Sequence, residues 1–515
     1  MKSKYITLIL FIALGFFSTG CSDNLNMEQH GVLSYDTYYK TDAEAETAIT
    51  TIYIKLRGME YNYKMLKNML SDDFWAGGGG RGDNSQLEAL NEYTFDAGQD
   101  FLKSVFESYY GIIYASNVAL GHIPEGTDVQ KQMRAEAKVF RAFAYFELIS
   151  MWGTPPLVDH ELKASEYNQP NGSPEALWNL VNTDLTEAIN SNYLTQKSSI
   201  DDNTNYRVTK QFAQALLGKA YLWQKKYKEA AEQLNAVINS GLYGLYQGDY
   251  SDILAYDHKN NRESVFESNR VDDATNVWDN SSLYQLMIGW RTDCMTISSD
   301  VYSSGWGFCN PRKGLYDAFV AEEGTDGYRL NETMKTYPQM VKLGNTVNSG
   351  KTIISEGYFT WKIRVKKGEV PAAGYGFADN NNIRWMRYAE VLLLAAEANL
   401  NAGDQLLADK DLNEVRTRAK VATKTGITLD DIVNEKRLEL CFECTRYQDL
   451  IRWGLGEKFM GTQGLNCPIL DSNGNVTYKS YNSEGKYGFK ERNNLLPFPS
   501  TEVNLNTNIV QNTGW

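Results

Sequence analysis

Two adjacent aspartates, a tryptophan and an arginine stand close together near the start of the chain. Asp72 and Asp73 are followed by Trp75, by four glycines at 77–80 and by Arg81. Two carboxylates can act as acid and base in glycoside hydrolysis, but they must flank the bond from opposite sides, roughly 5 to 9.5 Å apart. A flat indole with polar neighbours can instead bind the C–H face and the hydroxyls of a sugar. Adjacent carboxylates cannot flank a bond by themselves, so we predict a binding site with Trp75 as its platform.

More aromatic residues of this kind occur in the middle of the chain. They stand among Ser, Asn, Asp and Gly residues, which is the setting expected of a sugar platform. Trp290 differs because the apolar residues 286–288 precede it, and we expect it in the core. The predicted site residues of this region are the platforms Trp278, Tyr302 and Trp306 and the hydroxyl partners Asn310 and Arg312.

Metal binding and nucleophilic catalysis have few residues to draw on. Cys441 and Cys444 have the spacing of half a zinc site, but no histidine lies nearby in the sequence to complete four ligands. We therefore expect no metal, no cofactor and no catalytic residue. The remaining candidates are scattered along the chain: Cys294, Cys309 and Cys467, and His30, His122, His160 and His258.

The first twenty residues have the pattern of a bacterial lipoprotein signal peptide. Lys2 and Lys4 form a basic start, residues 5–17 are apolar, and small residues lead to Cys21. The apolar run is too short to span a ~30 Å hydrocarbon core. Acyl chains on Cys21 would anchor the mature chain, because each buried methylene contributes roughly 0.8 kcal/mol. The alternative is an ordinary secreted protein with a chance cysteine at this position.

The charge of the mature chain excludes some partners. Without Lys2 and Lys4 the chain has 49 basic and 64 acidic residues, a net charge of −15. This sign argues against nucleic acid and anionic membrane surfaces as partners. The 33 tyrosines and 11 tryptophans are more than a core needs, which is compatible with a neutral ligand bound by surface rings.

Apolar residues recur at helical spacing through two parts of the chain, about 35–241 and 384–455. Two stretches match the paired helices of a tetratricopeptide repeat: 210–240, with a turn at 224–227, and 391–419, with a turn at 401–404. Such repeats need neighbours to bury their faces, which predicts one stacked scaffold. Further helices are predicted at 41–57, 101–123, 129–151 and 174–192.

Between these parts, residues 242–382 are rich in Gly, Asn, Asp, Ser and Trp and lose the helical periodicity. So long a stretch is not expected to be a structureless loop. We predict an irregular, loop-rich ligand-binding subdomain with short strands, packed on the scaffold. Residues 71–85 have a similar composition and are predicted to form a mobile binding loop. The sequence thus predicts a mostly α fold, with a signal peptide at 1–20 and a single domain at 21–515.

Four separated segments resemble the SusD/RagB family. They read FRAFAYFEL at 140–148, followed by WGTPPL, RWMRYAEVLL at 384–393, EKRLELCFE at 435–443 and LPFP at 496–499. Two positions depart from the family pattern, since Cys444 replaces a usual Gly and Thr513 a usual Pro. Helical spacing places Glu435, Glu439 and Arg446 beside packing surfaces, so we expect them to form structural ion pairs.

The resemblance implies a helical fold in which four tetratricopeptide-like helix pairs support an irregular ligand-binding face. It also implies a lipid-anchored protein on the cell surface of the outer membrane, which binds an oligosaccharide or polysaccharide without cleaving it. The implied partner is a SusC-like TonB-dependent transporter. The resemblance leaves the identity of the glycan open.

Two other functions are compatible with parts of the sequence. A peptide-binding helical-repeat scaffold would use the repeat surface as its site, with the middle region as decoration. A glycoside hydrolase would need an acid from the middle region to complete a pair with Asp72 or Asp73. The signal peptide, the Trp-rich middle region and the four segments favour glycan capture over both.

Overall fold

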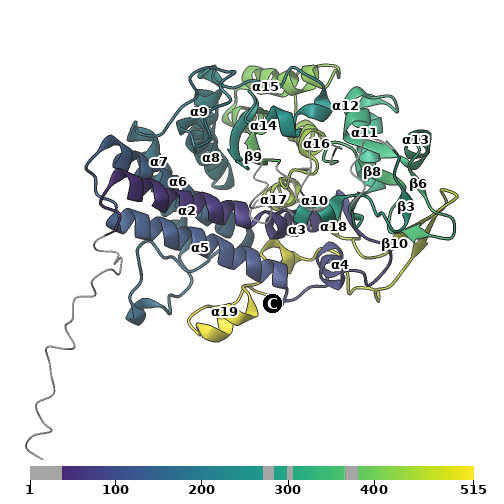
Figure 1. The fold of residues 1–515 in the computed structure, drawn as a ribbon, viewed down its shortest axis with the longest axis horizontal. Coiled ribbons are helices and arrows are strands. Elements are labelled where there is room, and N and C mark those ends of the chain that lie inside the picture. The colour runs from purple at the N-terminus through teal and green to yellow at the C-terminus, as the bar shows by residue number, and fades with distance from the viewer. Residues whose placement is uncertain (1–37, 271–282, 299–304, 365, 367–380) are drawn as a thin grey trace, which may run out of the picture.

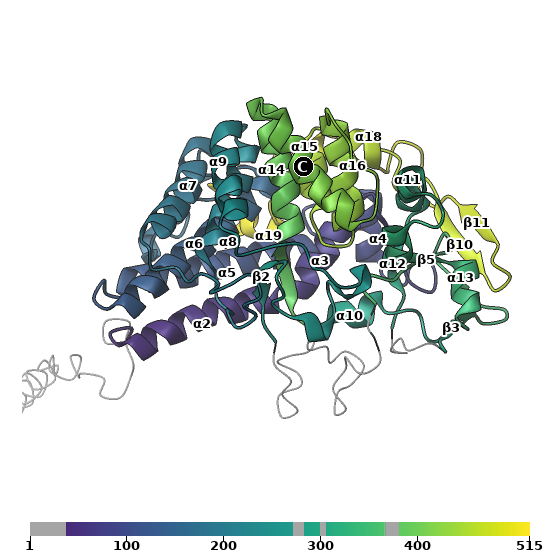
Figure 2. The same ribbon diagram turned by 90° about the horizontal axis from the view of Figure 1, so that it is seen from above.

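The computed structural model describes residues 38–270, 283–298, 305–364, 366 and 381–515. Trp278 and Tyr302, and the predicted signal peptide with Cys21, lie outside these ranges. Helices dominate, as predicted (Figure 1). The helices at 42–58, 100–122, 128–152 and 174–190 lie toward one end of the molecule and the strands at 295–296 and 467–471 lie at the other, in both views (Figures 1 and 2). Within the described residues, no helix has both the length and the apolar character needed to cross a membrane.

The first half of the scaffold is a series of antiparallel helices. Each predicted helix is confirmed, with ends shifted by one or two residues. Thr41 and Thr127 begin two of the helices with capping boxes, in which the threonine hydroxyl and a Glu or Gln three residues later satisfy the free N–H groups. The helices are α2 (Asp42–Gly58), α3 (Glu60–Met69), α4 (Ser85–Glu92), α5 (Asp100–His122), α6 (Asp128–Trp152), α7 (Pro174–Asn190), α8 (Lys210–Trp223) and α9 (Tyr227–Asn239).

The two predicted repeat units are helix pairs. In the first, α8 and α9 approach so closely that a Cβ added to Gly218 would lie 2.6 Å from Cγ of Leu234. In the second, α14 (Tyr388–Ala402) and α15 (Gln405–Arg418) are joined at Gly403, which has the left-handed backbone that glycine adopts without strain. Helix α14 also packs against α9 and α16 (Leu429–Leu440), so the two units share one core.

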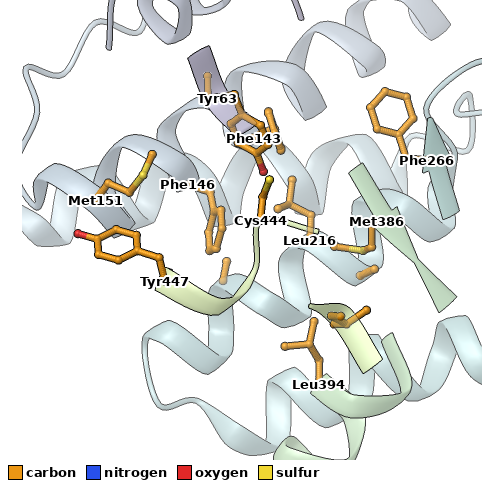
Figure 3. Close-up of a cluster of buried hydrophobic side chains, with 14 of the residues drawn as sticks. Tyr63, Phe143, Phe146, Met151, Leu216, Phe266, Met386, Leu394, Cys444 and Tyr447 are labelled. Atoms are coloured by element: carbon orange, nitrogen blue, oxygen red, sulfur yellow. The ribbon is translucent and has the colours of Figure 1, made fainter. Parts of the chain in front are cut away.

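That core joins segments from the whole length of the chain. Figure 3 shows Phe143 and Phe146 of α6 near Leu216 of α8, with Cys444 and Tyr447 from the C-terminal part. All five side chains are buried. Cys444 has a φ of 65°, the left-handed conformation for which glycine is suited, so its backbone accounts for the glycine usual at this position.

The middle region contains the short strands that were predicted, together with helices that were not. Helix α11 (Lys313–Glu323) escaped prediction because it buries only Leu315 and Phe319 and so lacks a long apolar stripe. The other helices are α10 (Leu283–Ile288), α12 (Tyr328–Thr333) and α13 (Tyr337–Lys342). The strands are β2 (Ser264–Ser268), β3 (Met295–Thr296), β4 (Phe308–Pro311), β5 (Met334–Thr336), β6 (Thr346–Val347), β7 (Thr352–Ile353), β8 (Tyr358–Thr360) and β9 (Ile383–Arg387).

The C-terminal part returns across the molecule. Strands β10 (Cys467–Asp471) and β11 (Val476–Lys479) form a three-stranded antiparallel sheet with β7, in the order β11-β10-β7. The last residues then run back to the early helices, where the indole N–H of Trp152 donates to the carbonyl of Pro497 at 2.8 Å. The remaining helices are α17 (Arg446–Arg452), α18 (Gly456–Met460) and α19 (Ser500–Leu505).

Candidate functional site

The segment predicted as a mobile binding loop contains a strand. Residues Phe74–Gly77 form β1, which pairs antiparallel with β4 and places Trp75 opposite Asn310. Gly77 is required here, because a Cβ at this position would lie 2.5 Å from the carbonyl oxygen of Gly307. The loop prediction was wrong because β1 is formed by pairing with β4, which lies more than 200 residues away and leaves no local signal in the sequence.

Asp72 and Asp73 are buried and ion-paired. Asp72 is 6% exposed and accepts from Nε and Nη2 of Arg446 at 2.7 and 3.0 Å. Arg437 reaches both carboxylates, with Nη2 at 2.9 Å from Asp72 and Nε at 2.8 Å from Asp73. Their role as ligand-binding groups is therefore corrected to a structural one. Both carboxylates are thus occupied by arginines within the protein.

Burial and charge act in opposite directions on the Asp72 carboxyl. Burial by itself would raise its pKa, but the positive charges of Arg437 and Arg446 outweigh burial and lower the pKa to about 2. Asp72 is therefore ionised at neutral pH and holds Arg437 and Arg446 close to the start of β1.

Trp75 is not an open platform. Its side chain is 9% exposed, and the Arg312 guanidinium lies 3.7 Å above the ring. Arg312 is itself held by the carbonyl of Phe74 and the side-chain oxygen of Asn91, at 2.6 and 2.9 Å. Because Arg312 covers the indole face, the structure contradicts sugar stacking on Trp75 in this conformation, and both residues are better explained as packing.

Asn310 and Arg81 are also engaged within the protein. Asn310 is buried and donates to the carbonyls of Gly307 and Ile354 at 2.9 and 2.7 Å. Arg81 pairs with Glu88 and Glu92, and its guanidinium lies 4.9 Å from the Tyr481 ring. Asn310 therefore cannot act as a hydroxyl partner. Arg81 remains partly exposed and could contact a ligand through its outer face.

Trp306 is the predicted platform that lies at the surface. Its side chain is 45% exposed, although its backbone is fixed. The N–H of Trp306 donates to the carbonyl of Leu286 at 2.9 Å, and its carbonyl accepts from Nη1 of Arg291 at 3.1 Å. An exposed indole on an ordered backbone costs little entropy to position for stacking.

Arg291 connects Trp306 to the glycine-rich segment. Its guanidinium pairs with Asp83 and with Asp293, the latter at 2.7 Å, and lies against Gly79, where a Cβ would be 2.9 Å from Cζ. Asp83 in turn accepts from the N–H of Gly79 at 3.0 Å. Residues 78–83 thus end next to Trp306, with one cation and two carboxylates at the surface. We call Trp306, Arg291, Asp83 and Asp293 the Trp306 surface.

The sequence analysis missed Arg291, Asp83 and Asp293. Arg291 and Asp293 follow Trp290, which was assigned to the core, and this assignment drew attention away from them. Trp290 is indeed buried, and its ring stacks 6.0 Å from that of Trp361. The change from an apolar ring at Trp290 to the polar Arg291 directly after it was a signal in the sequence that the chain reaches the surface there. Within the described ranges, no cluster of three or more His, Cys, Asp or Glu residues could hold a metal ion.

Comparison with known proteins bears on the whole chain. Residues 328–515 match the family described as "SusD family", and residues 28–222 match the family described as "Starch-binding associating with outer membrane". The chain belongs to the SusD/RagB family. Glu435, Glu439 and Arg446 lie within the region matched at 328–515, and all three form buried ion pairs, as expected.

Several relatives in the SusD/RagB family extend along almost the full chain. The SusD-like protein P2 of Formosa agariphila is 26% identical over 99% of both chains. The starch-binding protein SusD of Bacteroides thetaiotaomicron is 24% identical, over 75% of this chain and 73% of its own. Among solved structures, a laminarin-binding SusD-like protein is 25% identical, covering 93% of this chain and 100% of its own, with a TM-score of 0.77.

Proposed function

We propose that this protein captures an oligosaccharide or polysaccharide at the outer surface of the cell and passes it to a SusC-like TonB-dependent transporter. One observation carries the binding step: an aromatic ring, Trp306, is 45% exposed on a fixed backbone beside a charged, hydrogen-bonding rim. Relatives whose names state starch and laminarin binding support a glycan as the ligand.

The Trp306 surface has the two components that a sugar requires. The indole offers an apolar face for C–H groups, while Asp83, Asp293 and Arg291 offer acceptors and donors for hydroxyls. Burying ~60 Å² of sugar face contributes on the order of 1.5 kcal/mol per ring. A few such contacts give roughly millimolar to micromolar binding, which suits a protein that must release its cargo.

The anchor and the transporter belong to the same proposal. The signal-peptide pattern ending at Cys21 supports attachment by lipid. The family description "associating with outer membrane" supports the location. Family membership supports handover to a barrel transporter, and the weak binding estimated above is compatible with it.

Calorimetry on the acylation-free chain, starting at Ser22, tests glycan binding. A panel including starch and laminarin should return at least one ligand. Trp306→Ala should then lower affinity about tenfold with little change in melting temperature, because the ring is exposed. Trp306→Phe should retain most of the affinity. Unchanged binding in Trp306→Ala would remove this surface from the proposal.

The same preparations separate the two rival functions. We infer a protein without hydrolase activity, so the ligand should yield no new reducing ends over days of incubation. New reducing ends from the purified chain would contradict this. Capture of peptides in place of glycans on the same panel would favour a peptide-binding scaffold.

A further inference from the structure

A second surface lies on the C-terminal segment that follows β11. A groove of about 620 Å³ lies there, lined by Tyr93, Thr94, Tyr481, Asn482, Ser483, Gly485, Lys486, Tyr487, Gly488, Lys490 and Arg492. The segment is fixed by its backbone, since the N–H of Gly488 donates to the carbonyl of Glu92 at 2.9 Å and that of Phe489 to Met460 at 3.1 Å. We call this the C-terminal groove.

The charge of the groove is opposite to that of the chain. Its lining includes Lys486, Lys490 and Arg492, although the chain has a formal net charge of −13. Glu484 and Glu491 belong to the same segment and are exposed, but they do not line the groove. Among the described residues, no carboxylate forms an ion pair within 4.0 Å of these three cations, all of which are exposed. Lys479 lies beside the groove, with Nζ 5.0 Å from the Tyr481 ring.

The groove also has ordered aromatic and amide groups. The Arg492 guanidinium lies 4.3 Å from the Trp515 ring and donates to the carbonyl of Gly514 at 3.3 Å. Asn482 is held by Glu92 and by the carbonyl of Gly464, at 2.8 and 3.0 Å. Tyr481 is 40% exposed. A fixed cation and an exposed ring in one groove can bind an anionic group and an adjoining apolar face together.

The C-terminal groove is connected to the Trp306 surface by a short stretch of chain. Asp83 lies against Arg291 at one end of residues 81–83, and at the other end Arg81 lies 4.9 Å from the Tyr481 ring. A polymer that occupies the Trp306 surface could therefore continue past Arg81 into the groove.

We propose that the C-terminal groove binds the anionic groups of an acidic polysaccharide, either carboxylates or sulfate esters, through Lys486, Lys490 and Arg492. The ligand class rests on the glycan-capture function proposed above, and the groove adds the acidic substituent. Because the chain as a whole repels polyanions, binding of an acidic polymer requires a local positive surface such as this one. The interaction should weaken steeply with salt, since the lysines are exposed.

Dextran, dextran sulfate and carboxymethyl dextran test the groove on one polymer backbone. The Ser22–Trp515 chain should bind at least one charged form more tightly than dextran at low salt. Lys486→Gln with Lys490→Gln should weaken that binding roughly tenfold. The control Lys225→Gln with Lys228→Gln removes the same charge from exposed positions around the α8–α9 turn and should leave binding unchanged. Melting curves of both variants should match the parent, because all four lysines are exposed.

Each outcome decides between sources or against the groove. If only dextran sulfate binds more tightly than dextran, the groove recognises sulfate esters. If only carboxymethyl dextran does so, the groove recognises carboxylates. Equal binding of dextran and both charged forms, or equal losses in the groove and control variants, would overturn the inference. The test of the Trp306 surface with neutral glycans does not depend on the groove. Binding of neutral glycans with no preference for charged polymers would refute the groove alone. Absence of binding to any glycan would refute the proposed function as well.

Discussion

Asp72 and Arg446 form a two-point ion pair between residues 374 positions apart, with N–O distances of 2.7 and 3.0 Å. Both side chains are 6% exposed. The pair joins the segment before β1 to the start of α17, and Arg437 of α16 reaches the same carboxylate at 2.9 Å. The early glycine-rich segment is therefore positioned by the C-terminal helices.

Asp72→Asn should destabilise the protein by roughly 3 kcal/mol, because it leaves two buried arginines without their shared carboxylate. Urea unfolding measures this directly. Asp257→Asn, at an exposed position, should change stability little. Glycan affinity of the folded Asp72→Asn protein should stay near that of the parent. A stable variant that lost all binding would return Asp72 to the ligand site.

Acid should destabilise the protein through two buried carboxylates. Burial alone would raise the pKa of Glu439, but Arg418 and Arg387 outweigh it and lower the pKa to about 2, as for Asp72. Both folded-state pKa values lie below those of the unfolded chain, so their stabilisation is present above about pH 4 and is lost as pH falls toward 2. The free energy of unfolding should drop over this window. A flatter drop is expected in Glu439→Gln, which should already be less stable at pH 7.

Asp411 should make the protein less stable as the pH rises, which is opposite to the effect of Asp72 and Glu439. It is buried in α15, and burial raises its pKa to about 7, although Asn399 donates to it at 2.9 Å. Because this pKa lies above the unfolded value, the stability contributed by the neutral acid is lost as pH rises from about 4 to 7. Asp411→Asn should therefore stabilise the protein at pH 8, by up to a few kcal/mol, and have little effect at pH 4. Equal effects at both pH values would show that folding does not raise the pKa of Asp411.

Trp75→Ala should cost about 3 to 5 kcal/mol of stability, since it removes a buried ring and the surface on which Arg312 rests. The matched comparison is Trp306→Ala, which should lower binding and leave the melting temperature nearly unchanged. Trp75→Ala with an unchanged melting temperature and weaker glycan binding would restore Trp75 as a platform.

Cys21→Ala should release the protein from the membrane fraction without unfolding it, because the proposed anchor is covalent lipid. Fractionation of cells that lack the transporter provides the measurement. Membrane association of this variant in such cells would contradict lipid attachment.

The scaffold could be predicted because its signals are local. The α8–α9 and α14–α15 pairs can be recognised from the spacing of their apolar residues and from the glycine or short turn between the helices, all within about 30 residues. The site could be predicted only in part. Trp75 and Trp306 have equally polar and glycine-rich neighbours in sequence, yet one is buried by β4 and Arg312 and the other is exposed. That difference depends on partners more than 200 residues away.

The same distance explains the error at Asp72 and Asp73. A pair of carboxylates beside glycines resembles a surface loop until Arg437 and Arg446 are placed against it. The C-terminal groove was missed for a related reason. Its lysines have no distinctive sequence pattern, and only the fold brings them to the same groove as Tyr93 and Thr94.

The contact between Asp72 and Arg446 also constrains how the chain reaches its native state. Contacts between residues far apart in sequence form slowly, because a long loop must close before they are made. An exported chain that emerges with its amino end first has Asp72 and Asp73 in place long before their arginines arrive. Until residues 437–446 are available, these two carboxylates lack the arginines that pair with them in the folded protein. We therefore expect the glycine-rich segment next to Trp306 to become ordered late in folding, and a product truncated before α17 to lack the ion pairs that position it.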